Sequence, residues 1–235
     1  MMYSWKLEAK MYLSRVEIDF DNRRKTRNLS HLGAYHDWVE RSFPKDLNLE
    51  NRSRKLWRVD RLNNKYYLLI VSQNKPLIRS EKNPEKEGLE RYGVLGTGQV
   101  KDYDPFLNSI QNQMTMRFRV KLNTVRSDAE EGRKAGLKRG RLFPIVNQED
   151  LVKFFMARAE ANGFKVKEDS FLVVEKGFEK MKKKNMKPLD LAMAVYEGVL
   201  TVTDREKFIK ALTEGIGKKK AYGFGMMTVI PMNKA

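Results

Sequence analysis

A glycine- and lysine-rich segment near the end of the chain places the strongest constraint on the fold. Residues 215–225 read Gly-Ile-Gly-Lys-Lys-Lys-Ala-Tyr-Gly-Phe-Gly. Residues 204–215 have the apolar spacing of an amphipathic helix that Thr203 or Asp204 can cap, and residues 224–231 have the composition of a strand. Because glycine permits positive φ angles and close backbone approach, we predict a tight helix-to-strand connection. Its lysines favour a phosphate ligand, although a solvated basic turn would look the same.

The spacing of these glycines excludes the familiar nucleotide-binding loops. A P-loop needs GxxxxGK[ST] ahead of a helix, and the dinucleotide fingerprint also leads into a helix, whereas this segment follows one. The chain has no cysteine and only two histidines, His31 and His36, and no HExxH pattern occurs. We therefore expect no metal site and no cofactor.

The charge of the chain indicates the kind of partner. Its 235 residues carry a net charge of +17, which implies a polyanion, with nucleic acid as the first choice and an anionic membrane as the second. No apolar run approaches the roughly 20 residues that span a bilayer, and no signal peptide is recognisable. We therefore expect a cytoplasmic protein with no membrane partner.

The order of predicted elements repeats once along the chain. Each half reads strand, helix, strand, strand, helix, strand, which predicts an α+β fold of two tandem ferredoxin-like (RRM-like, βαββαβ) domains. In the first half the elements are 11–20, 31–43 with Ser30 as a possible cap, 55–61, 65–73, 83–92 and 98–103. In the second half they are 114–122, 148–162, a hairpin of 164–167 with 171–175, 191–202, the helix from 204 and the strand from 224.

The domain limits follow from this repeat. We predict an N-terminal extension over 1–10, a first domain over 11–103 that carries His36, a linker over 104–113, and a second domain over 114–235 with the basic segment and the glycine-rich segment.

Two groups of basic residues in the second half are candidates for contact with RNA. Arg117, Arg119 and Lys121 alternate along one strand, so that all three point to the same side of the sheet. A polar, glycine-containing stretch follows and carries Lys138, Arg139 and Arg141. These residues form either an RNA-binding surface or a solvated loop. The lysine-rich stretch 181–187 is more typical of a mobile loop.

His36 is the candidate for acid-base chemistry. Imidazole titrates near neutral pH and can move a proton during phosphoryl transfer. RNA cleavage by its own 2′-hydroxyl requires a base, an acid and cations that stabilise the developing charge, but no metal. His36 also borders the apolar stripe of its helix, so a structural role is the alternative. His31 is the weaker candidate because it lies at the start of the helix.

Several stretches resemble the CasE family, the CRISPR repeat-processing endoribonucleases of type I-E systems. They are Met11-Tyr-Leu-Ser-Arg-Val, the spacing from His36 to Phe43-Pro44, Phe118–Asn123, Leu137–Pro144, and the end from Tyr196 through the glycine-rich segment to Val229. The resemblance covers about residues 11–232 and is weakest over 74–113. It implies a tandem ferredoxin-like fold and metal-independent cleavage at the base of a repeat hairpin. The products would carry a 5′-hydroxyl and a cyclic or 3′-phosphate.

The resemblance also implies roles for particular residues. The family's catalytic histidine falls on His36, and Arg41 lies where a family cation assists. The family tyrosine three residues before the histidine falls on Gly33, so Tyr35 is the nearby tyrosine candidate, although adjacent helix positions point about 100° apart. The glycine-rich loop of the family would hold the RNA backbone through Gly215, Gly217, Lys218, Lys219, Lys220, Gly223 and Gly225.

Together these observations predict an RNA-processing endonuclease. It would bind the CRISPR repeat hairpin as precursor and as mature crRNA, and remain with its product among the other subunits of a Cascade complex. The first alternative is a non-catalytic RNA-binding protein of ferredoxin-like fold, which catalysis by His36 would exclude. The second is a basic structural subunit that contacts other proteins and has no preference for hairpins.

Overall fold

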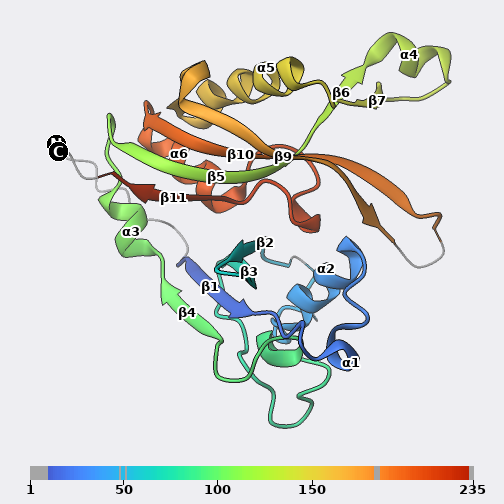
Figure 1. Ribbon diagram of the computed structural model, residues 1–235, viewed down its shortest axis with the longest axis vertical. Coiled ribbons are helices and arrows are strands. Elements are labelled where there is room, and N and C mark those ends of the chain that lie inside the picture. The colour runs from blue at the N-terminus through green and yellow to red at the C-terminus, as the bar shows by residue number, and fades with distance from the viewer. Residues whose placement is uncertain (1–9, 48, 51, 183–185, 233–235) are drawn as a thin grey trace.

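The computed structural model describes residues 10–47, 49, 50, 52–182 and 186–232. The predicted extension over 1–10 lies outside the described residues except for Lys10, and the lysine-rich stretch 181–187 lies partly outside them. Figure 1 shows two antiparallel sheets, one above the other, with helices packed around them. No helix in the described ranges is long and apolar enough to cross a membrane.

The N-terminal sheet has the ferredoxin-like strand order β2-β3-β1-β4. Its antiparallel strands are β1 (Tyr12–Glu17), β2 (Lys55–Leu62), β3 (Lys65–Ser72) and β4 (Gln99–Asp102). A short helix α1 (Arg23–Thr26) and the longer α2 (Leu32–Arg41) connect β1 to β2. The tight turn between β2 and β3 is confirmed, because Asn63 and Asn64 have φ angles of 49° and 63°, as a primed hairpin turn requires.

The second helix of this half is shorter than predicted. In place of a helix over 83–92 there is only one 3-10 turn, η1 (Leu89–Arg91). Gly88 precedes it with a φ of +91°, and a Cβ at this position would lie 2.8 Å from the carbonyl oxygen of Ile78. A helix cannot continue through this conformation, so Gly88 limits the element to the residues that follow it.

The C-terminal sheet repeats the ferredoxin-like order, with strands β11-β5-β10-β8 and β9 also paired to β10. These strands are β5 (Thr115–Asn123), β8 (Phe164–Lys165), β9 (Phe171–Met181), β10 (Leu189–Val202) and β11 (Met227–Pro231). The helices α5 (Gln148–Ala159) and α6 (Arg205–Glu214) pack on it through Phe155 and Phe208. The fold is thus the predicted tandem ferredoxin-like fold.

The predicted hairpin of 164–167 with 171–175 is wrong. β8 pairs with Thr201 and Val202, and β9 pairs with β10 from Gly198 to Leu189, so neither strand pairs with the other. Both run antiparallel to β10 and therefore follow one another along the same edge. The 3-10 turn η3 (Glu168–Ser170) interrupts what is in effect one edge of the sheet.

Two connections between the main elements carry structure of their own. Residues 104–113, predicted as a linker, contain the helix α3 (Asp104–Ser109). The basic stretch after β5 forms a small arm. It consists of β6 (Val125–Asp128), α4 (Ala129–Lys134), a loop and β7 (Arg141–Pro144). The arm projects from the edge of the C-terminal sheet (Figure 1).

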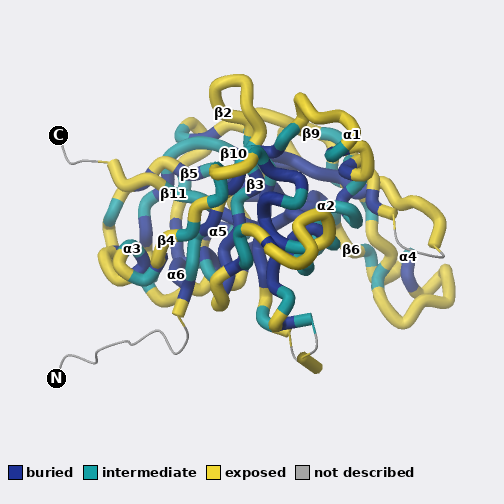
Figure 2. Tube along the Cα trace, turned by 90° about the horizontal axis from the view of Figure 1, so that it is seen from below, coloured by how far each residue is buried: buried dark blue, intermediate teal, exposed yellow. Residues whose placement is uncertain are grey.

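The two sheets share an apolar interior, which holds them in one orientation. One buried cluster joins Leu56 and Val71 of the N-terminal sheet to Val120 of the C-terminal sheet. A second joins Trp38 and Trp57 to Phe224, which follows the glycine-rich segment. Figure 2 shows the buried residues running through the centre of the molecule and exposed residues over the arm that carries α4. Burial of apolar surface at about 25 cal/mol per Å² makes such shared clusters a main source of stability.

Candidate active site

Helix α2 carries His36 and begins one residue later than the sequence suggested. Its N-cap is His31 rather than Ser30, because the Nδ1 atom of His31 accepts a hydrogen bond of 3.2 Å from the backbone N–H of Ala34. The helix buries Leu32, Trp38 and Val39 against the N-terminal sheet, whereas His36 is only half-buried. The imidazole of His36 is therefore held on a packed helix and remains within reach of a ligand.

The glycine-rich segment forms the predicted tight connection after α6. It contains a 3-10 turn, η4 (Lys220–Tyr222), flanked by the left-handed residues Lys219 and Gly223 with φ angles of 58° and 80°. The two ends of the segment are joined by a hydrogen bond of 2.9 Å from the N–H of Ile216 to the carbonyl oxygen of Gly225. The segment thus closes on itself, with η4 between its two joined ends.

Trp57 on β2 attaches this segment to the N-terminal sheet. Its indole Nε1–H donates a hydrogen bond of 3.0 Å to the carbonyl oxygen of Ala221. Gly223 lies against its ring, where a Cβ would be only 2.7 Å away, and Tyr35 of α2 stacks on the ring at 5.8 Å. One side chain therefore links the helix that carries His36 to the segment that carries Tyr222.

His36 and Tyr222 meet at a basic hollow of about 720 Å³, hereafter the first hollow. Their ring centroids are 5.2 Å apart. The charged residues that line this hollow are the acid Glu40 and the cations Arg52, Arg54, Lys55, Lys219 and Lys220. Burial, with a contribution from Arg54, lowers the pKa of Lys220, so an anion in the hollow would favour its charged form.

A second hollow of about 880 Å³ also has His36 and Tyr222 in its lining. Its cations are Arg27, Arg91 and Lys182, and His31 lines it as well. Burial, followed by the charge of Lys182, lowers the pKa of His31. Arg27, Arg91 and Lys182 were not predicted as site residues. Arg27 belongs to the basic loop 21–30 and Lys182 to the lysine-rich stretch 181–187, which was interpreted as a mobile loop.

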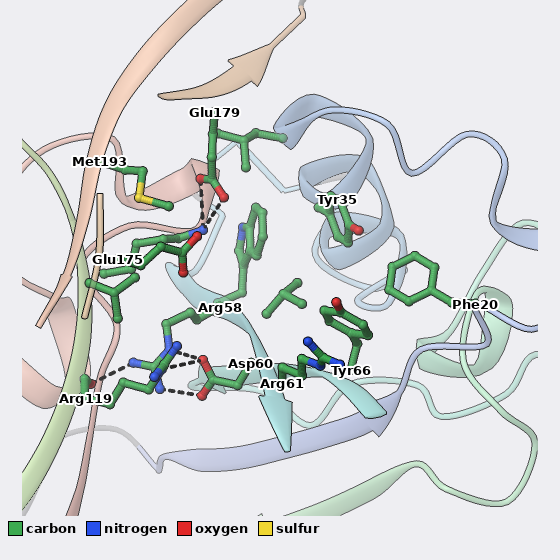
Figure 3. Close-up of a pocket in the computed structure, with 15 residues that line it drawn as sticks. Phe20, Tyr35, Arg58, Asp60, Arg61, Tyr66, Arg119, Glu175, Glu179 and Met193 are labelled. Atoms are coloured by element: carbon green, nitrogen blue, oxygen red, sulfur yellow. Dashed lines mark hydrogen bonds and ion pairs between the residues drawn. The ribbon is translucent and has the colours of Figure 1, made fainter. Parts of the chain in front are cut away.

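Tyr35 and Arg41 are not brought to either hollow. Tyr35 lines a different cavity of about 720 Å³ between the two sheets, together with Tyr66 and Glu179 (Figure 3). Burial, then the charge of Glu179, raises its pKa to about 12. Arg41 is held by Asp37 on the same helix, with its Nε 2.9 Å from a carboxylate oxygen. Adjacent positions on α2 thus point their side chains to different sides, as helix geometry requires.

The alternating cations of β5 divide between the surface and the space between the sheets. Arg117 is exposed. Lys121 is only 6% exposed, and its ammonium lies 2.9 Å from Glu179 and over the ring of Phe224. Arg119 contacts Asp60 at 3.3 Å and also Glu197. Arg119 and Lys121 therefore belong to the junction of the two sheets rather than to an open surface.

Arg58 is the centre of this junction, and sequence reasoning missed it. Its side chain is buried and paired with Asp60, as Figure 3 shows. It donates hydrogen bonds of 2.7 Å to the carbonyl oxygens of Arg119 and Met226. Burial alone would raise the pKa of Asp60, but Arg58 and Arg119 outweigh it and hold that pKa below its usual value. In an alternating strand, the sequence does not distinguish a buried arginine that joins two sheets from an arginine on the surface.

The remaining predicted cations lie on the arm. Lys138, Arg139 and Arg141 are all exposed in the loop and strand that follow α4, and the guanidinium of Arg141 lies 5.4 Å from the ring centroid of Phe143. Within the described part of the chain, no three His, Asp or Glu side chains are grouped so that they could hold a metal ion.

Comparison with known proteins identifies relatives of the whole chain. A family model described as CRISPR associated protein matches residues 11–231. The CRISPR-associated endoribonuclease Cse3 of Thermus thermophilus is 25% identical in an alignment of 232 residues that covers 94% of this chain and 100% of that protein.

Solved structures share the fold. The structure of Thermus thermophilus Cse3 bound to an RNA representing a pre-cleavage complex has a TM-score of 0.72 and 22% identity, and covers 94% of this chain and 100% of that chain. A chain of a CRISPR RNA-guided surveillance complex has a TM-score of 0.62 and 17% identity, with the same coverage.

Proposed function

This chain belongs to the CRISPR associated protein family, and from that premise we propose that it is an endoribonuclease that cleaves CRISPR precursor RNA. The cut would fall at the base of the repeat hairpin. The relative from Thermus thermophilus is named a CRISPR-associated endoribonuclease and is matched over its full length. The observation that carries the proposal is the position of His36, a half-buried imidazole at the meeting point of two basic hollows.

The chemistry that suits this arrangement is attack by the RNA's own 2′-hydroxyl. The 2′-oxygen forms a bond to phosphorus while the bond from phosphorus to the 5′-oxygen breaks. The 2′-hydroxyl loses one proton and the 5′-oxygen gains one, so the products are a 2′,3′-cyclic phosphate and a 5′-hydroxyl. The cations Arg54, Lys219 and Lys220 would stabilise the negative charge on the phosphate oxygens during this step.

The proposal also states which residues would hold the RNA after cleavage. We assign Lys138, Arg139 and Arg141 on the arm to phosphates of the stem, because A-form RNA is bound mainly through its shape and its backbone. The glycine-rich segment would hold the strand near the cleaved bond. We also propose that the product is retained in a Cascade complex in the cytoplasm. The surveillance-complex chain that shares this fold supports the assembly.

The test is cleavage of the repeat RNA from the same genome under single-turnover conditions. Wild-type protein should cleave in excess EDTA, and a 2′-deoxy sugar at the cleaved nucleotide should block the reaction. His36→Ala should slow cleavage by about 10²-fold or more, the usual scale for an acid-base group, with little change in affinity for the hairpin.

The control for that variant is His31→Asn, which removes the other imidazole and keeps a side chain that can cap α2. Cleavage at the wild-type rate by His36→Ala would contradict the assignment. Tight hairpin binding by wild-type protein without any cleavage would favour the alternative of a non-catalytic RNA-binding protein.

A further inference from the structure

His36 and Tyr222 lie where the two basic hollows adjoin. Both side chains line the first hollow, with Lys219 and Lys220, and both line the second hollow, with Arg27 and Arg91. A strand whose phosphates occupy both hollows must therefore cross the His36–Tyr222 pair. This crossing point is the place where one phosphodiester would be flanked by an imidazole and a phenol.

The proposed cleavage requires a second proton-transfer group beside His36. His31 accepts the N–H of Ala34 through its Nδ1 atom and caps the helix. Tyr35 stacks on Trp57 and lines the cavity between the sheets. Arg41 is paired with Asp37. Tyr222, at 5.2 Å between ring centroids, is a proton donor that the fold places next to His36.

The position of Tyr222 is set by the backbone around it. The N–H of Tyr222 donates a hydrogen bond of 2.8 Å to the carbonyl oxygen of Lys219, which closes the turn η4. Trp57 binds the carbonyl oxygen of Ala221 from one side, and Gly223 rests on the indole ring. A group held in this way loses little freedom when the RNA binds, which is what an efficient acid or base requires.

We propose that Tyr222 is the general acid of the cleavage and that His36 is the general base, a role that rests on the function proposed above. His36 takes the proton of the 2′-hydroxyl as the 2′-oxygen bonds to phosphorus. Tyr222 gives its phenolic proton to the 5′-oxygen as the bond from phosphorus to that oxygen breaks. The resulting imidazolium returns a proton to the phenolate across the ring contact, so both side chains end the reaction unchanged.

The test uses two substrates that differ in the leaving atom. One is the repeat RNA with its natural 5′-oxygen at the mapped cleavage position, and the other carries a 5′-sulfur there. A thiolate leaves without protonation, so it removes the need for a general acid but not for a base. Single-turnover rates and hairpin affinity are measured for wild type, Tyr222→Phe, His36→Ala and the matched control Tyr35→Phe.

Tyr222→Phe keeps the ring and loses only the hydroxyl. We expect it to cleave the oxygen substrate about 10²-fold more slowly than wild type, with unchanged affinity, and to cleave the sulfur substrate at nearly the wild-type rate. His36→Ala should be slow on both substrates, and Tyr35→Phe should behave as wild type on both.

Two results would overturn the role of Tyr222 alone. One is a wild-type rate for Tyr222→Phe on the oxygen substrate, and the other is an equal defect on both substrates. Failure of wild-type protein to cleave the oxygen substrate would instead overturn the proposed endonuclease function, and the role of Tyr222 with it.

Discussion

At the scale of single residues, the lysines of the glycine-rich segment are not equivalent. Lys220 lines the first hollow next to Arg54, whereas Lys218 is exposed and lines neither hollow. Lys220→Ala should therefore weaken hairpin binding and flatten the slope of log affinity against log salt by somewhat under one unit, the amount expected for one lost phosphate contact. Lys218→Ala is the matched control, and filter binding at several salt concentrations measures both. Equal effects of the two substitutions would show that the hollow does not hold a phosphate.

At the scale of elements, the glycine-rich segment depends on its contact with β2. Gly217 and Gly223 have nearly the same φ angles, 79° and 80°, but a Cβ would meet the Trp57 ring only at Gly223. Gly217→Ala should cost about 1 kcal/mol from the left-handed backbone alone. Gly223→Ala should cost more and should also slow cleavage, because the ring and η4 must separate. Urea unfolding and single-turnover cleavage compare the pair, and equal losses of stability would contradict the role of the contact.

At the scale of the whole molecule, Arg58 joins the two sheets. It is 1% exposed, and its replacement by methionine would remove the guanidinium that donates to two backbone carbonyls and leave a partly buried carboxylate with Arg119 beside it. Arg58→Met should lower the free energy of unfolding by about 3–5 kcal/mol, the scale for breaking a buried ion pair. Arg61→Ala, an exposed arginine on the same strand, should change it by no more than about 0.5 kcal/mol. Thermal or urea unfolding measures both, and a small effect of Arg58→Met would mean that apolar packing alone holds the sheets together.

Much of the secondary structure followed from local patterns. The alternation of β5, the helical spacing of α2 and α6, and the Asn63-Asn64 turn each depend on a few neighbouring residues, and all were confirmed. The predictions were wrong where contacts between residues far apart in the chain determine the strand pairing. β8 and β9 were expected to pair with each other, but both pair with the same edge of β10. The domain limits around residues 103 and 114 stay a prediction.

The sequence by itself determined the fold class and the basic character of the protein, and it indicated His36 and the glycine-rich segment as candidates for a site, because periodicity, charge and residue type are local properties. Only the tertiary structure decided which cations line the two hollows. Arg119 and Lys121 are paired with carboxylates between the sheets, whereas Arg54 and Lys220, far apart in the chain, line the first hollow together. The same holds for Tyr222, which lies 186 positions after His36 in the chain and reaches it only because Trp57 fixes the segment against β2. A pairing of this kind depends on how two sheets pack, and no local pattern encodes it.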